Sequence, residues 1–300
     1  MRRFLTPLIV IFLIGLVSLM VKSIMGRQKE AEAGPTASAA VETPGIASTT
    51  AASAPGENTV APAALHYPDL DKVRIPAGVP SQEVDYTGFR LSFNKENGTP
   101  NWVAWELLGS ETDGAATRGS RKFFADYDVD GCPENSDYSN SGYDRGHMCP
   151  AADQKWSEDA MTDCFVMTNM CPQDHALNSG AWSTLEKRER IWAQRDSAIV
   201  IVSGPIYEKS DRQRIGDAEV RVPSAFFKVF VAPYLAQPRG IAFVYPNMTA
   251  PGSMEQYVMT IDEVERITGY DFFYALPDDI ETAVESSSSF KDWNRNPRKR

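Results

Sequence analysis

The feature that most constrains the fold is a long stretch without aromatic residues. No Phe, Trp or Tyr occurs between Phe12 and Tyr67, and residues 27–66 are rich in Ala, Pro, Ser and Thr. Such a segment buries too little apolar surface to offset the chain entropy that folding removes. We therefore expect a flexible, disordered linker over residues 27–66 and a folded domain that begins near residue 67.

A strongly apolar segment precedes this linker. Two arginines lead into an apolar run from Phe4 to Met20, and Lys22 is the only charge up to residue 25. About 20 apolar residues in a helix span a bilayer, and flanking arginines favour a cytoplasmic N-terminus. Residues 1–26 are therefore predicted to be an uncleaved signal anchor, that is, a transmembrane helix, or a signal peptide cleaved near Ala31-Glu32-Ala33. The length of the run favours the anchor.

Both readings of the N-terminus imply the same side of the membrane. An anchor would hold the domain outside the cytoplasm, in the periplasm or outside the cell, and a cleaved signal peptide would release it by secretion. We therefore expect a membrane-anchored protein, with a secreted one as the alternative.

Residues 67–285 have the size of a single domain. Apolar residues alternate over 89–93 and over 103–107, around an Asn- and Gly-containing turn, which predicts a β-hairpin. Further strands are expected at 165–168, 198–203, 226–231 and 241–245, and helices at 158–163, 178–194 and 261–268. Because strands and helices do not alternate regularly, we expect an α+β fold with a mainly antiparallel central sheet. Residues 286–300 become polar and then basic, and are predicted to be a loose tail.

The charge balance excludes one class of function. The chain has 30 Lys and Arg residues against 40 Asp and Glu, a net charge of −10. A protein held to nucleic acid by bulk positive charge is therefore excluded, whereas a local basic cleft is still allowed. The four cysteines include no C-x-x-C pair, so a disulfide scaffold and a zinc ribbon are also excluded.

The first cluster with chemical potential surrounds one of three histidines. His147 follows Asp144, Arg145 and a glycine, and no two histidines have the spacing of a helical metal site. Charged groups in a core need partners, so this segment is either a salt-bridged turn or part of a functional site.

The second cluster begins at Asn178. Asn178, Trp182, Glu186 and Arg190 follow one another at steps of four, which places them on one face of a helix. The face is either a solvated stripe with a Glu186–Arg190 ion pair, or a set of oxygen ligands suited to Mg²⁺, which binds few protein oxygens and keeps most of its waters.

Together the two clusters resemble a known family. The sequence Asp144-Arg145-Gly146-His147, followed after about 30 residues by Leu177-Asn178-Ser179-Gly180-Ala181-Trp182 and then Leu185-Glu186, is similar to the DNA/RNA non-specific endonucleases. These are the ββα-metal-finger nucleases, which include endonuclease G. The resemblance extends from Ser81 to Leu276. It implies a ββα-metal finger within the α+β domain and hydrolysis of phosphodiester bonds in DNA and RNA with little sequence preference.

The resemblance also implies roles for individual residues. His147 would be the general base that takes a proton from water. Asn178 would be the one direct protein ligand of a divalent metal, Mg²⁺ in the first place and Mn²⁺ as an alternative, and Glu186 would hold metal-bound water. Arg145 and Arg190 would bind phosphate oxygens.

Other positions are assigned less uniquely by the resemblance. Asn169 corresponds to a polar, substrate-binding residue of the cleft. An upstream arginine of the family faces the transition-state phosphate; Arg118 is slightly favoured for this role, which would leave Arg121 in contact with substrate or solvent. Asp144 is expected to orient other groups or to form a structural ion pair.

The cysteines depart from the family pattern. If their segments are neighbouring strands, as in the family, a disulfide between Cys149 and Cys171 could form in an oxidising compartment, and two buried free thiols are the alternative. Cys132 and Cys164 have no assignment.

The expected partners are DNA and RNA as substrates, a membrane through the N-terminal helix, and a second copy in a homodimer. Since the contacts would go to phosphates, cleavage should fall steeply with salt. Three other functions stay open at this point: a catalytically silent, membrane-tethered nucleic-acid-binding module of the same fold, a structural or adhesion domain, and a phosphodiesterase for another phosphate ester.

Overall fold

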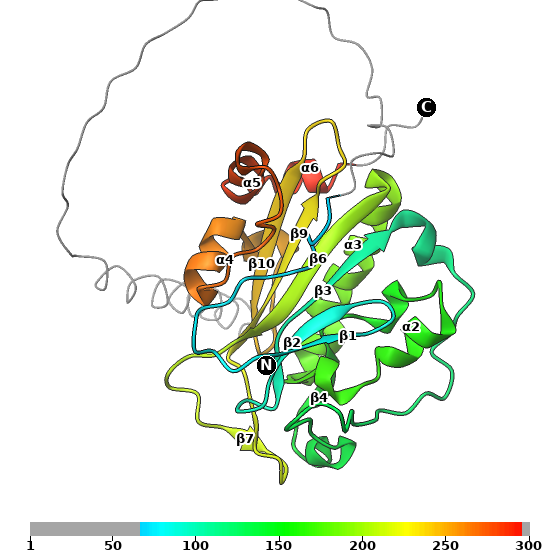
Figure 1. The fold of residues 1–300 in the computed structure, drawn as a ribbon, viewed down its shortest axis with the longest axis vertical. Helices are drawn as coiled ribbons and strands as arrows, with labels where there is room; N and C mark the ends of the chain where they lie inside the picture. The colour runs from blue at the N-terminus through cyan, green and yellow to red at the C-terminus, as the bar shows by residue number, and fades with distance from the viewer. Residues whose placement is uncertain (1–66, 296–300) are drawn as a thin grey trace, which may run out of the picture.

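The computed structural model describes residues 67–295 (Figure 1). The predicted N-terminal anchor or signal peptide and the predicted linker lie outside these residues. Within residues 67–295, no helix is both long enough and apolar enough to cross a membrane.

A seven-stranded antiparallel sheet forms the centre of the domain, which confirms the predicted α+β class. Its spatial order is β1-β2-β3-β6-β9-β10-β11. The strands are β1 (Gln82–Asp85), β2 (Arg90–Asn94), β3 (Thr99–Leu108), β6 (Ala198–Ile206), β9 (Ala225–Ala232), β10 (Arg239–Pro246) and β11 (Val258–Met259). The long central strands are almost wholly buried, because helices cover both faces of the sheet.

The two faces bury separate apolar clusters. Along β3, the period-two alternation of a strand sends Trp105 to one face and Trp102 to the other. Helices α2 (Glu158–Asp163) and α3 (Ser183–Asp196) pack on the Trp105 face, and α4 (Ile261–Thr268) and α5 (Asp278–Glu285) pack on the Trp102 face (Figure 1). The domain therefore has three layers, with the sheet in the middle.

A small two-stranded sheet lies on the α3 side. It pairs β4 (Asp144–His147) with β5 (Met170–Gln173), with His147 opposite Met170. The chain then continues through a π-helical segment, Leu177–Trp182, into α3. This arrangement brings both sequence clusters into one ββα unit. A further two-stranded sheet pairs β7 (Arg214–Ile215) with β8 (Val220–Arg221).

Several predicted elements are confirmed. The hairpin is formed by β2 and β3, and α2 and α4 begin and end at the predicted residues. In α4, the Thr260 hydroxyl accepts from the Glu263 amide, the Glu263 carboxylate accepts from the Thr260 amide, and Gly269 ends the helix with a left-handed φ of 75°.

The predicted strand at 165–168 is wrong. Tight turns continue from the end of α2, and residues Met167–Asn169 form a 3₁₀ turn before β5 begins at Met170. The residues are apolar because they are buried on the α3 face, and a short apolar run does not distinguish a strand from a buried turn.

The predicted loose tail is also wrong for its first half. Residues Phe290–Trp293 form α6, and the Trp293 side chain is fully buried. Its indole N–H donates to the Gly240 carbonyl at 3.1 Å, and its ring packs edge-on against Trp192 with centroids 5.0 Å apart. One aromatic residue thus fixes a polar segment to the core.

Candidate active site

A cavity of about 500 Å³ opens where the ββα unit meets the loop that contains Arg118. Five residues singled out from the sequence line it: Arg118, Arg145, His147, Asn178 and Glu186. They come from a loop, from β4, from the π-helical segment and from α3, so only the fold brings them together.

His147 is held at the end of β4 between aromatic rings. Phe123 and Phe165 lie with ring centroids 5.5 Å and 5.3 Å from the imidazole. Nε2 is buried and has no hydrogen-bond partner within residues 67–295. Burial and the positive charge of Arg118 lower the pKa of His147 to about 3, so the imidazole is neutral at physiological pH and can accept a proton.

Asn178 is oriented by an acidic residue of β4. Its side-chain Nδ2 donates to Oδ2 of Asp144 at 2.9 Å, and the same oxygen lies 2.8 Å from Nδ1 of His175. Because the amide nitrogen donates to Asp144, the amide oxygen is the atom with which Asn178 could bind a cation. The π-helical turn around Asn178 is a type of local irregularity that is frequent at functional sites.

Glu186 lines the same cavity two helical turns after Asn178. Burial raises the pKa of its carboxyl to about 7, and the charges of Lys228 and Arg190 oppose this rise. An amide oxygen and a carboxylate on one helix face are hard ligands of the kind that Mg²⁺ binds, directly or through water. The side chains present therefore fit a hydrated divalent cation at this position.

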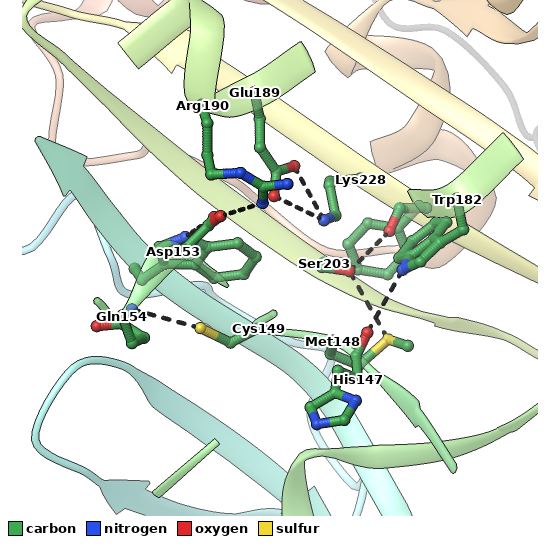
Figure 2. Close-up of polar contacts among 12 residues, drawn as sticks. His147, Met148, Cys149, Asp153, Gln154, Trp182, Glu189, Arg190, Ser203 and Lys228 are labelled. Carbon is green, nitrogen blue, oxygen red and sulfur yellow. Dashed lines mark hydrogen bonds and ion pairs between the residues drawn. The ribbon is translucent and has the colours of Figure 1, made fainter. Parts of the chain in front are cut away.

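Buried charged groups also lie near Glu186, since the charges of Lys228 and Asp153 act on its carboxyl. Figure 2 shows the ion pairs that these two residues form with Glu189 and Arg190. Lys228 Nζ lies 3.0 Å and 3.3 Å from the two carboxylate oxygens of Glu189, and both side chains are fully buried. Asp153, also fully buried, accepts from Arg190 at 2.7 Å and from the Trp105 indole N–H at 3.1 Å. These pairs bury both signs of charge near the Glu186 carboxyl.

The sequence indicated none of this arrangement around Lys228, Glu189 and Asp153. A signal was present in the strand Ala225–Ala232, where Lys228 is the only charged residue in an otherwise apolar run. A lysine at the centre of a buried strand requires a buried partner. Lys155, which also lines the cavity, was likewise not identified from the sequence.

The two candidate arginines have different surroundings. Arg118 is exposed, lines the cavity, and lies over the Phe165 ring with its Cζ 5.0 Å from the centroid. Arg121 forms an ion pair with Glu158 and donates from Nε to the Thr162 hydroxyl at 2.9 Å, so it is tied to α2. Only Arg118 therefore faces the cavity.

Three predicted substrate-binding residues lie away from the cavity lining: Arg121, Asn169 and Arg190. Asn169 is fully buried; its amide donates to the carbonyls of Cys149 and Cys164, both at 2.9 Å, and accepts from the Cys149 amide at 2.9 Å. Arg190 pairs with Asp153. The structure thus commits these side chains to internal contacts, which residue spacing could not indicate.

All four cysteines are free thiols, so the structure contains no disulfide between Cys149 and Cys171. Cys149 instead interacts with the Cys164 thiol and accepts from the Gln154 amide at 3.5 Å. Burial raises the pKa of the Cys149 and Cys171 thiols well above the usual range, as expected for thiols that are not nucleophiles.

Comparison with known proteins identifies the family of this chain. Residues 66–279 match the family model described as DNA/RNA non-specific endonuclease. The chain therefore belongs to the DNA/RNA non-specific endonuclease family. In three dimensions it is similar to a chain of the solved EndoG/EndoGI complex, with a TM-score of 0.63 and 26% identity over 70% of this chain and 94% of that chain.

Two relatives illustrate the range of the family. The mitochondrial nuclease EXOG of Danio rerio is 35% identical over 212 residues, which are 64% of this chain and 60% of that protein. A nuclease of Nostoc sp. is 33% identical over 212 residues, 66% of this chain and 75% of that protein. The chain spans between 56% and 60% of the length of the vertebrate EXOG nucleases that it matches.

The comparison corrects the expected location. The names of the EXOG relatives, of nuclease 1 of Schizosaccharomyces pombe and of the Saccharomyces cerevisiae nuclease place those proteins in mitochondria. The prediction of a catalytic domain in the periplasm or outside the cell, anchored or secreted, is contradicted by this finding. That prediction rested on the apolar N-terminal run, its flanking arginines and a possible cleavage site, and these features do not specify which membrane or compartment is meant.

Proposed function

We propose that this protein is a divalent-metal-dependent endonuclease that hydrolyses phosphodiester bonds of DNA and RNA with little sequence preference. The observation that carries the proposal is one shared cavity, lined by His147 and by Asn178, whose amide nitrogen is already bound to Asp144. Membership of the endonuclease family supports the same conclusion.

His147 is the proposed general base. Its low pKa keeps the ring in the neutral form, and the residue lines the cavity, where the ring would take a proton from the attacking water. The aromatic rings of Phe123 and Phe165 fix the direction of the imidazole. The negative charge of a bound phosphate would oppose the effect of Arg118 and so strengthen the base when substrate is present.

Asn178 is the proposed direct ligand of the metal, and Glu186 is proposed to hold it through water. Mg²⁺ is the ion we expect, with Mn²⁺ as the alternative. When bound, the cation supplies positive charge for the scissile phosphate and the leaving oxygen. Asp144 accepts from the Asn178 amide nitrogen, which leaves the amide oxygen to bind the cation.

Arg118, Arg145 and Lys155 are proposed to bind phosphate oxygens, because all three line the cavity. Arg145 donates to the Asn135 carbonyl at 2.6 Å, which fixes the guanidinium, while its Nε has no partner within residues 67–295. Contacts of this kind read the backbone and not the bases, so activity should be sequence-tolerant and should fall with salt. Membrane association and a homodimer stay predictions from the sequence.

The test is cleavage of plasmid DNA and of RNA by the full-length protein, with Mg²⁺ or with EDTA. Wild-type protein should degrade both substrates only with the metal. His147→Ala should lower the rate by about 10²–10⁴-fold while nucleic-acid binding is retained. Binding without cleavage by the wild-type protein would instead favour the catalytically silent module, and an unchanged rate in His147→Ala would refute the proposed base.

A further inference from the structure

A second group of acidic side chains lies on the opposite face of the sheet from the cavity. Asp262 and Glu265 belong to α4 and Glu285 belongs to α5; the two helices pack against each other and against β10 (Figure 1). One carboxylate oxygen from each residue lies within 4.8 Å of the other two. Three like charges at such separations repel one another unless a cation or protons neutralise them.

Glu285 shows that this group is more than an exposed acidic patch. Glu285 is only 8% exposed, and its Oε1 is buried without a hydrogen-bond partner within residues 67–295. A buried carboxylate oxygen normally has a partner, because leaving it bare costs the full desolvation penalty. The missing partner is therefore a group that residues 67–295 do not supply.

Within residues 67–295, the charged groups that act most strongly on Glu285 are other carboxylates: Glu265, Glu281, Asp262 and Asp271. The last turn of α5 contains no basic residue, although a helix C-terminus favours cations.

The surroundings fix the two helices closely enough to hold an ion. A Cβ added to Gly240 of β10 would lie 2.3 Å from the Val284 carbonyl and 2.7 Å from Cδ1 of Ile261, so glycine lets both helices approach the strand. The Glu265 carboxylate accepts from the Phe272 amide at 2.8 Å, which orients it. Asp262 is exposed, so the group is open to water and to an incoming ion.

We propose that Asp262, Glu265 and Glu285 form a calcium-binding site that joins α4 to α5. Ca²⁺ binds carboxylate and water oxygens at about 2.3–2.6 Å in a flexible geometry, whereas Mg²⁺ demands near-ideal octahedral geometry at about 2.0–2.1 Å. Water would complete the coordination on the exposed Asp262 side. The site is separate from the proposed catalytic cation, which lies on the α3 side of the sheet.

The test uses the full-length protein with Asn178→Ala, which removes the proposed ligand of the catalytic cation. Calorimetric titration with Ca²⁺ should give one equivalent per chain, with a Kd on the order of 10⁻⁴ M for a site with three carboxylates and water. At about 100 times that Kd, Ca²⁺ should raise the folded-to-unfolded ratio about a hundredfold, and the thermal midpoint by about 5 °C or more relative to EDTA. Mg²⁺ at the same concentration should give a smaller shift.

Glu285→Gln in the same background should abolish both the heat of binding and the calcium-dependent shift. In EDTA this variant should melt at about the same temperature as its parent, because glutamine matches the shape of the glutamate side chain; a merely damaged protein would melt lower. Asp279→Asn is the matched control, since it removes an exposed acidic charge from the same helix outside the group.

Absence of calcium binding in the Asn178→Ala chain would overturn the proposal, and so would an undiminished calcium shift in Glu285→Gln. An equal response to Mg²⁺ would overturn the choice of calcium. Neither result depends on nuclease activity, so the outcome is independent of the proposed function.

Discussion

The buried ion pair between Lys228 and Glu189 allows a quantitative test of how much each buried charge depends on its partner. Lys228 and Glu189 are both fully buried, and Nζ of Lys228 also lies 5.3 Å and 4.9 Å from the ring centroids of Trp105 and Trp182. Replacing Lys228 with Met preserves most of the apolar stem and removes the charge. Breaking a buried pair from one side costs about 3–5 kcal/mol, because the remaining charge stays buried without compensation. We therefore expect Lys228→Met to lower the free energy of unfolding by about 3 kcal/mol or more at neutral pH.

The size of this loss should depend on pH. Burial raises the pKa of the Glu189 carboxyl, and Lys228 opposes that rise. Without Lys228 the folded-state pKa is higher still, so the folded variant binds a proton that the unfolded chain does not. Stability from such a group is present below the unfolded pKa and is lost as pH rises towards the folded pKa, by up to about 1.4 kcal/mol per pH unit. The deficit of Lys228→Met should therefore be larger at pH 7.5 than at pH 5.5.

The assay is urea unfolding followed by circular dichroism at both pH values. The double variant Lys228→Met/Glu189→Met removes both charges and should be more stable than either single variant, with a coupling energy of about 2 kcal/mol or more. A Lys228→Met chain that stays within about 1 kcal/mol of wild type at both pH values would refute the reasoning, and so would simple additivity of the two substitutions.

Four further predictions follow from other contacts. Arg118→Ala should lower the cleavage rate by about tenfold or more, whereas Arg121→Ala, outside the cavity, should change it less than threefold in the same plasmid assay. Asn169→Ala should cost about 3 kcal/mol in urea unfolding, because it leaves three buried backbone groups without partners. Asp144→Ala should raise the Mg²⁺ concentration for half-maximal cleavage about 10- to 100-fold, since the proposed amide ligand loses its orienting contact. Trp293→Ala should cost about 3–5 kcal/mol in urea unfolding, and wild-type stability would show that the C-terminal segment is not part of the core.

Local patterns predicted much of the fold because their physical causes are local. The capping box and glycine stop of α4, and the alternation around the β2–β3 turn, depend on residues within a few positions of one another. The same reasoning wrongly predicted a strand at residues 165–168, because a turn that is buried on several sides is as apolar as a strand.

The polar C-terminal segment was misjudged for a related reason. Its composition suggests a tail, but the Trp293 indole donates a hydrogen bond to β10 and packs edge-on against Trp192 of α3. Neither partner is near in sequence, so composition could not reveal the contact.

The sequence by itself determined which chemical groups the site contains: an imidazole, an amide and a carboxylate, in an order and spacing that are typical of one nuclease family. Only the tertiary structure decided which arginine faces the cavity and that the Asn169 side chain bonds buried backbone groups. It also decided that Lys228 and Glu189 form a buried ion pair. The physical reason is that residue type and local spacing fix what a side chain can do, whereas its partners are set by strand register and helix packing between distant segments. The burial and the neighbouring charges that set the pKa of a group result from that packing, so they cannot be predicted from any single position in the sequence.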